Sequence, residues 1–524
     1  MTYHKFKSVF PESVHHWIFF VLLCILAASM PTSRYVMSLS QILMGVNWLL
    51  EGYYREKIIR FSKNKPALIF TSMYALYLIG ILWTEDLAMG FGSDLKNKIP
   101  MLTLTFIVAS SKPFNREQLN WLLLVFSAAV LVTTFIGFSV YLSGDFVNFR
   151  HISPYVSHVY LSMMVVITIF LLPWIAHRMS PDKKWFFAAL LISLWLLIFL
   201  FILRSMTGIF CLVGVLAFLA FRFVFSNHNL ILRFIAGAGM LVIISVMVIV
   251  PWRMYNKVSE QREYENSEFT QNTSRGNAYL HHTDEILREN GYLVYTFIAK
   301  EELREAWNER SEIDYDSRDL PGNELKVTIY RYLSSKGYKK DREALMRLSD
   351  EEIKSIERGI PNYLYNEWPG ILVRVHQSVW EVYWYTKTRN PSGHTLTQRF
   401  ELWKGSWQAF REKPIFGWGT GDIFIAVDFG LNKIDSEMEN YHMKPHNQYL
   451  LLLLMLGLAG TITYFFLYAY FVNITKAYTF LPFNIFLTIM LISMLGNNPI
   501  DAQTGQTFFT FFTLFFGIMY RKGF

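Results

Sequence analysis

The chain has 524 residues, of which 52% are hydrophobic and 17% carry a charge. A typical soluble domain carries about 25% charged residues, and the mean hydropathy of this chain is +0.25. The low charge and high hydropathy disfavour one large soluble globule. Disorder is excluded, because disordered chains lack this much apolar mass. The composition predicts an integral membrane protein with several spans.

Twelve apolar runs follow one another along the chain, and a helix needs about 20 such residues to cross a bilayer. They are 14–30, 35–51, 66–83, 98–111, 119–142, 158–177, 185–203, 205–225, 231–251, 447–473, 481–498 and 505–520. We expect an all-α fold, a polytopic membrane helix bundle of about twelve transmembrane helices. The first run is interpreted as a retained span and not as a removed signal peptide.

Charged residues are concentrated between the ninth and tenth runs. Residues 252–398 hold 21 Lys and Arg and 24 Asp and Glu, which is half of all charged residues in the chain. We therefore expect nine spans over residues 1–251, a water-exposed insert over 252–446, and three spans over 447–524. Because the insert is slightly acidic and lacks the basic character of a nucleic-acid-binding domain, no nucleic acid partner is expected.

The orientation follows from the positive charges of the short loops. If the N-terminus is cytoplasmic, seventeen Lys and Arg lie in inside segments and five lie in short outside loops. Both termini are then expected in the cytoplasm, and the insert is expected outside the membrane.

Local signals in the insert predict a helical subdomain. Residues 300–310 and 325–336 have the composition of charged helices, and Ser349 with Glu352 forms a capping box before a third helix. Gly359, closely followed by a proline, supplies its end. Both cysteines of the chain lie in apolar runs, so the insert has no disulfide framework.

The end of the insert predicts an amphipathic helix over residues 398–412. Phe400, Trp403, Trp407 and Phe410 are spaced as one helical stripe. Such a stripe can lie on the membrane surface or pack against the insert.

A glycine-rich segment follows, with Gly417, Gly419 and Gly421 in alternation. It has no GK[ST] ending, which excludes a P-loop. A tight turn that directs the chain back into the membrane is favoured over an anion-binding loop.

Two arginines are candidates for binding an anion. Arg204 lies at the outside border of two apolar runs, where it either reaches the headgroups or serves an anion site, because arginine at membrane depth is costly. Arg399 opens the amphipathic helix and is either a solvated charge or a second cation beside Arg204. Two guanidinium groups suit a diphosphate, since each presents a planar fork to phosphate oxygens.

His446 lies at the start of the tenth run, where it is either an interfacial polar residue or a general base. His442 lies four residues earlier. No carboxylate with metal-motif spacing accompanies this pair, so no metal site is expected.

At this point the sequence resembles the O-antigen ligase family, whose superfamily includes O-antigen polymerases and some O-oligosaccharyltransferases. The resemblance rests on Gln398-Arg399 with Trp403, PIFGWG at 414–419, HNQYL at 446–450, LGLAG at 456–460 and RSMTG at 204–208. It covers the layout of about twelve spans with one long periplasmic segment late in the chain. The chain departs from the pattern at Met455, where many relatives carry Glu, and in the length of the 255–395 insert.

The resemblance implies an O-antigen ligase-type glycosyltransferase of the bacterial inner membrane. The donor would be a glycan on undecaprenyl diphosphate, and the acceptor a sugar hydroxyl of lipid A–core or of another glycan or protein. No cofactor is implied. Arg204 and Arg399 match the diphosphate-binding arginines, and His446 matches the histidine that activates the acceptor. Secondary candidates are Lys98, Arg150, His442 and Asn447.

Other functions stay open. An O-antigen polymerase or a protein O-oligosaccharyltransferase differs mainly in the acceptor. A membrane transporter or flippase is disfavoured because, apart from Arg204, the apolar runs are nearly free of ionisable groups.

Overall fold

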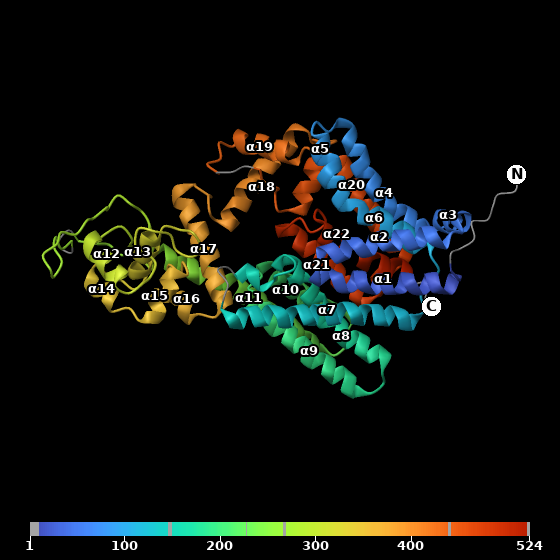
Figure 1. Ribbon diagram of the computed structural model, residues 1–524, viewed down its shortest axis with the longest axis horizontal. Helices are drawn as coiled ribbons and strands as arrows, with labels where there is room; N and C mark the ends of the chain where they lie inside the picture. The colour runs from blue at the N-terminus through green and yellow to red at the C-terminus, as the bar shows by residue number, and fades with distance from the viewer. Residues whose placement is uncertain (1–9, 145–148, 227, 266–268, 439–441, 521–524) are drawn as a thin grey trace. The chain divides into compact units, whose positions relative to one another are not determined.

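The computed structural model describes residues 10–144, 149–226, 228–265, 269–438 and 442–520, which are predominantly helical (Figure 1). The chain divides into two compact units. The first unit comprises Met1–Gly144, Ile152–Met240 and Gln398–Phe524, and the second comprises Asp145–His151 and Leu241–Thr397.

Every expected apolar run lies on a helix of the first unit or on α11, which continues into the second. The helices are α1 (Glu12–Thr32), α2 (Arg34–Glu51), α3 (Tyr54–Ser62), α4 (Lys65–Gly80), α5 (Leu87–Met89), α6 (Lys96–Ser110), α7 (Arg116–Ser143), α8 (His158–Met179), α9 (Lys183–Ile202), α10 (Met206–Ser226), α11 (Leu230–Ser259), α18 (Thr395–Glu412), α19 (Ile423–Lys433), α20 (Gln448–Thr475), α21 (Leu481–Gly496) and α22 (Gln503–Leu514). Short helical turns occupy Ile81–Trp83, Gly90–Leu95, Phe149–Ile152, Ala477–Thr479 and Phe515–Met519.

Eight helices in the described part of the chain are long and apolar enough to cross a membrane. They are α1, α4 with the turn that follows it, α7, α8, α9, α10, α11 and α20. The other four expected spans coincide with α2, α6, α21 and α22, which fall short of that length or apolarity. The chain is thus a multi-pass helical membrane protein, while the count of twelve spans stays a prediction.

The core of the first unit is built around its last helix. All residues from Thr504 to Tyr520, in α22 and the turn after it, are buried. This segment packs against α6 and also contacts α1, α4, α20 and α21. A helix that is buried on every side must be apolar or have paired polar groups, and α22 is rich in phenylalanine and threonine.

The second unit is mainly helical, as expected, but its first part is irregular. Its helices are α12 (Lys300–Asn308), α13 (Leu325–Ser335), α14 (Arg342–Met346), α15 (Asp350–Glu357), α16 (Leu364–Glu367) and α17 (Gly370–Thr388). One antiparallel hairpin joins β1 (Arg288–Glu289) to β2 (Tyr292–Leu293). The capping box of Ser349 and Glu352 is present at the start of α15, and Gly359 takes the left-handed conformation just after the helix ends.

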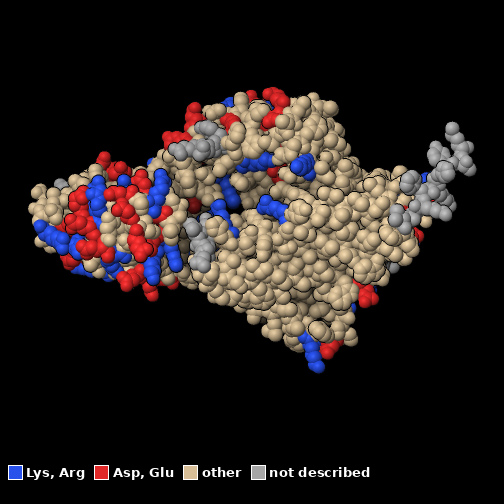
Figure 2. All heavy atoms as spheres, in the orientation of Figure 1, with Lys and Arg blue, Asp and Glu red and all other residues tan. Residues whose placement is uncertain are grey.

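The two units differ in surface chemistry. Figure 2 shows positive and negative side chains densely mixed over the second unit, which contains α12 to α16, whereas the first unit presents broad uncharged surfaces. An uncharged helical exterior suits lipid, and a densely charged exterior suits water. The residues of the expected insert, 252–446, are divided between the two units, since those from Gln398 onward belong to the first. The exposure of the insert to water stays a prediction.

Candidate functional site

Arg204 lies in the turn that joins α9 to α10. Its φ is 50°, a left-handed conformation that is uncommon outside glycine. The turn is fixed on both sides, since the Arg204 N–H donates to Phe201 O at 3.2 Å and the Ser205 hydroxyl donates to Ser162 Oγ of α8 at 3.0 Å. The guanidinium thus projects from a rigid turn at the end of two apolar helices.

Asn497, just after α21, connects this turn to the start of α20. Its Nδ2 donates to Thr207 Oγ1 at 2.9 Å, three residues after Arg204. Its backbone oxygen accepts from the Gln448 N–H at 3.1 Å, two residues after His446. Segments that are distant in sequence therefore meet at one end of α21.

Arg399, in α18, reaches the same place. A methyl group built on Gly496 would lie 3.6 Å from Arg399 Nη1, so the guanidinium is beside the last residue of α21. The neighbouring helical turn of α18 is also anchored there, because Trp403 Nε1 donates to Pro445 O at 2.9 Å, one residue before His446.

His446 also has a left-handed backbone, with φ of 50°. Asn447, next to it, is the N-cap of α20: its Oδ1 accepts from the N–H groups of Tyr449 at 3.0 Å and Leu450 at 3.1 Å. Its Nδ2 donates to Leu495 O of α21 at 3.1 Å. Arg204, Arg399 and His446 therefore each belong to a segment that contacts residues 495–497. Asn447 acts in this arrangement as a cap.

The glycine-rich segment is a turn between α18 and α19 that packs against other parts of the first unit. That it directs the chain back into the membrane stays a prediction. Its N–H groups are used within the protein: Trp418 donates to Leu454 O at 2.7 Å and Thr420 to Gly80 O at 3.2 Å. The turn enters a kink of α20 at Gly457, whose φ is 62°. A methyl group on Gly417 would lie 2.5 Å from the Gly457 nitrogen, so two backbones touch here. The N–H groups of Trp418 and Thr420 are therefore not available to an anion.

The amphipathic helix α18 buries a different face from the aromatic stripe. Leu402, Gly405, Ser406 and Ala409 are buried, and a methyl group built on Gly430 of α19 would lie 1.9 Å from Gly405 O. Trp407 is half exposed. The stripe is therefore at the edge of the packed face.

The secondary candidates have other surroundings. Lys98 is fully buried and paired with Asp501 at 3.1 Å, so it is not open to a ligand. His442 is exposed and lies 3.4 Å from Asp428 of α19. Arg150 is exposed and belongs to the second unit.

Sequence reasoning missed a buried set of four charges in the first unit. Lys444 Nζ lies 2.9 Å from Asp94 Oδ1 and 2.8 Å from Asp501 Oδ2, while Lys98 pairs with the other oxygen of Asp501. Lys98 is a secondary candidate from the sequence, but the sequence pattern predicts neither its pairing with Asp501 nor the pairing of Lys444 with Asp94. The proximity of Lys444 to His446 was the available signal, but its partners are far away in the sequence.

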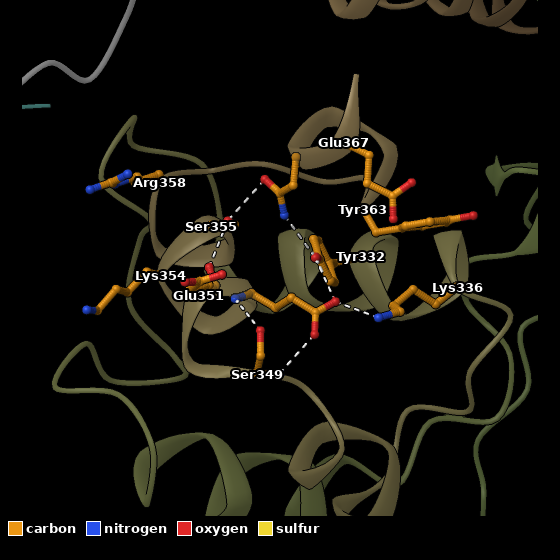
Figure 3. A pocket seen from close by; sticks show the side chains of 11 residues that line it. Tyr332, Lys336, Ser349, Glu351, Lys354, Ser355, Arg358, Tyr363 and Glu367 are labelled. Atoms are coloured by element: carbon orange, nitrogen blue, oxygen red, sulfur yellow. Dashed lines mark hydrogen bonds and ion pairs between the residues drawn. The ribbon is translucent and has the colours of Figure 1, made fainter. Parts of the chain in front are cut away.

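The second unit carries a polar recess of about 440 Å³ between α13, α15 and α16 (Figure 3). Glu352 lines it and accepts from Tyr332 Oη at 3.0 Å and from Lys336 Nζ at 2.5 Å. These contacts hold the pKa of Glu352 below its usual value despite its partial burial. Asn366 Nδ2 donates to Tyr332 Oη at 3.1 Å, so the polar groups satisfy one another.

Among the described residues, no group of three or more His, Cys, Asp or Glu is arranged to hold a metal ion. The fold and these contacts define a multi-pass membrane protein in which Arg204 and His446, on turns, and Arg399, on α18, belong to segments that meet at the end of α21.

The family model for O-antigen ligase matches residues 359–465, which include Arg399, the glycine-rich turn, His446 and the kinked start of α20. The resemblance drawn from the sequence is thereby confirmed over this part of the chain. Comparisons with curated proteins and with solved structures found no match.

Proposed function

We propose that the chain is an O-antigen ligase that transfers a glycan from undecaprenyl diphosphate to a sugar hydroxyl of lipid A–core. The reaction would occur at the periplasmic face of the bacterial inner membrane, with both termini in the cytoplasm. The observation that carries the proposal is the meeting of three segments at the end of α21, since Arg204, Arg399 and His446 each belong to a segment in contact with residues 495–497.

Each group has a role that its chemistry supports. Breaking the glycosyl–phosphate bond leaves a negative diphosphate, and the guanidinium groups of Arg204 and Arg399 stabilise that charge as it develops. The imidazole of His446 takes the proton of the acceptor hydroxyl. Both substrates are lipids, so holding them at one membrane face supplies proximity.

The proposed reaction is a single displacement without a metal. The acceptor oxygen attacks the anomeric carbon opposite the departing diphosphate, which inverts that centre. A product with the anomeric configuration of the donor contradicts this step. Activity that is abolished by chelation of divalent cations contradicts the metal-independent form.

The test is transfer by the purified protein in lipid, with a defined undecaprenyl diphosphate-linked glycan and lipid A–core. We expect His446→Ala and Arg204→Lys each to lower kcat by about 100-fold or more, in the range seen when a general base or a charge-stabilising donor is removed. Arg399→Lys is expected to do the same, because an ammonium cannot reproduce the bidentate fork. Arg411→Lys, on the exposed end of α18, is the matched control and should retain activity.

The choice of acceptor separates this proposal from its alternatives. Elongation of the lipid-linked glycan itself would indicate a polymerase, and transfer to a protein hydroxyl would indicate a protein O-oligosaccharyltransferase. Movement of the donor between leaflets without any transfer would indicate a flippase.

A further inference from the structure

A cluster of four charges in the first unit comes from three separate parts of the chain. Asp94 precedes α6, Lys98 lies in its first turn, Lys444 lies just before α20, and Asp501 lies between α21 and α22. Lys98 Nζ donates to Asp501 Oδ1 at 3.1 Å and to Asp94 O at 3.2 Å. Lys444 Nζ bridges Asp94 Oδ1 and Asp501 Oδ2 at 2.9 and 2.8 Å.

The set is electrically balanced but expensive to bury. Asp94 and Lys98 are fully buried, Asp501 is 6% exposed, and the side chain of Lys444 is partly buried, at 18% exposed. Removing such ions from water costs several kcal/mol of solvation free energy per ion. The attraction between opposite charges offsets this cost only where their geometry is good. A buried ion pair is therefore weak evidence for stability alone, while it fixes the relative position of the segments that supply it.

Lys444 is the member closest to the proposed site. One residue, Pro445, separates it from His446; this proline has a fixed φ, and its backbone oxygen accepts a hydrogen bond from Trp403 Nε1. On the other side of His446, Asn447 caps α20 and is tied to α21. The left-handed backbone of His446 is thus held between an ionic anchor and a helix cap.

The contacts on both sides of His446 can enforce its unfavourable left-handed backbone conformation. A non-glycine residue at positive φ costs of order 1 kcal/mol or more and persists only where its surroundings enforce it. A small displacement of a catalytic group lowers the rate strongly, because proximity and orientation contribute a large part of the barrier reduction.

We propose that Lys444 is a positioning residue for His446: its ammonium, clamped between Asp94 and Asp501, fixes the chain entering α20 and so sets the direction of the imidazole. The inference rests on the proposed role of His446 as the base. Lys444 acts through the backbone of residues 445 and 446 and need not touch the substrate.

The test uses the full-length protein and the charge-balanced double variant Asp94→Asn/Lys444→Met, which retains the pair between Lys98 and Asp501. The matched control is Glu412→Gln/Lys433→Met, which removes a carboxylate–lysine pair from the exterior of the same unit. Two readouts are taken: steady-state transfer, and hydrogen exchange of the amides of residues 448–451, which are held by the cap and by Asn497.

We expect the double variant to lower kcat about 30-fold or more while KM for the lipid-linked donor changes less than threefold. Exchange at residues 448–451 should rise about tenfold or more, and the control variant should match the unsubstituted protein in both readouts. Unchanged kcat, or reduced kcat with unchanged exchange, overturns the positioning role. If the unsubstituted protein transfers no glycan to any acceptor, the proposed function fails, and the exchange measurement still decides whether Lys444 anchors the segment.

Discussion

The ammonium of Lys340, in the core of the second unit, donates a hydrogen bond to the backbone oxygen of Leu293 at 3.1 Å. The side chain is 2% exposed, and burial lowers its pKa to about 7. The unfolded chain has the ordinary lysine pKa near 10.5, so between these two values the unfolded state binds a proton that the folded state lacks. The free energy of unfolding therefore rises with pH across this window.

We predict that the second unit becomes more stable as pH is raised from 7 to 9, by at most about 1.4 kcal/mol per pH unit from this residue. Lys340→Met should remove this slope and stabilise the unit at pH 7, since it removes a buried charge, while Ser334 Oγ still donates to Leu293 O. The measurement is pulse proteolysis in urea of the full chain, scored by cleavage within residues 241–397.

The control for this prediction is Lys354→Met on the exposed face of α15. It should leave the pH slope unchanged. A Lys340→Met protein that retains the slope would assign the pH dependence to another group.

At the scale of elements, the kink of α20 is required by the turn that enters it. The N–H groups of Leu458 and Ala459 donate to Pro414 O at 2.8 Å and Ile415 O at 3.1 Å, outside the helix. Gly457 provides the left-handed φ of 62°. A methyl group there would lie 2.2 Å from Ile415 O.

Gly457→Ala is therefore predicted to destabilise the first unit by about 3 kcal/mol, through backbone strain and overpacking combined. Gly45→Ala is the matched control, because a methyl group at Gly45 in α2 meets nothing within 4 Å and alanine is the better helix former. Thermal unfolding in detergent should show a lower midpoint for Gly457→Ala and an equal or higher midpoint for Gly45→Ala.

The capping box illustrates what local sequence predicts well. Ser349 and Glu352 satisfy each other's backbone N–H groups in the structure, as their spacing indicated. The expected helices at 300–310 and 325–336 are also present, with boundaries that differ by a residue or two. Caps and periodicity are short-range properties, so they can be inferred without knowing the tertiary contacts.

At the scale of the whole molecule, the distribution of positive loop charges predicts which side of the membrane each segment faces. We predict that Glu305→Cys in the insert, in a chain lacking Cys24 and Cys211, reacts with a membrane-impermeant maleimide in cells whose inner membrane is intact. Lys183→Cys, at the start of α9, should react only after the membrane is broken. Both positions are exposed, so accessibility to water does not limit either reaction.

This prediction is independent of catalysis. Labelling of both positions from the same side would contradict the orientation. If residue 183 is labelled and residue 305 is protected in intact cells, the orientation is the reverse of the predicted one. The proposed site would then face the cytoplasm.

The sequence by itself determined that this is a helical, multi-pass membrane protein with one charged insert and an O-antigen ligase-type segment. The length of apolar runs, the charge of loops and short motifs are properties of consecutive residues. They can therefore be recognised without knowing how the helices pack. The structure alone decided that the segments carrying Arg204, Arg399 and His446 meet at the end of α21, and that Lys444 is clamped by Asp94 and Asp501. Those contacts join residues separated by much of the chain, and their pairing depends on how the helices pack, which no local pattern encodes.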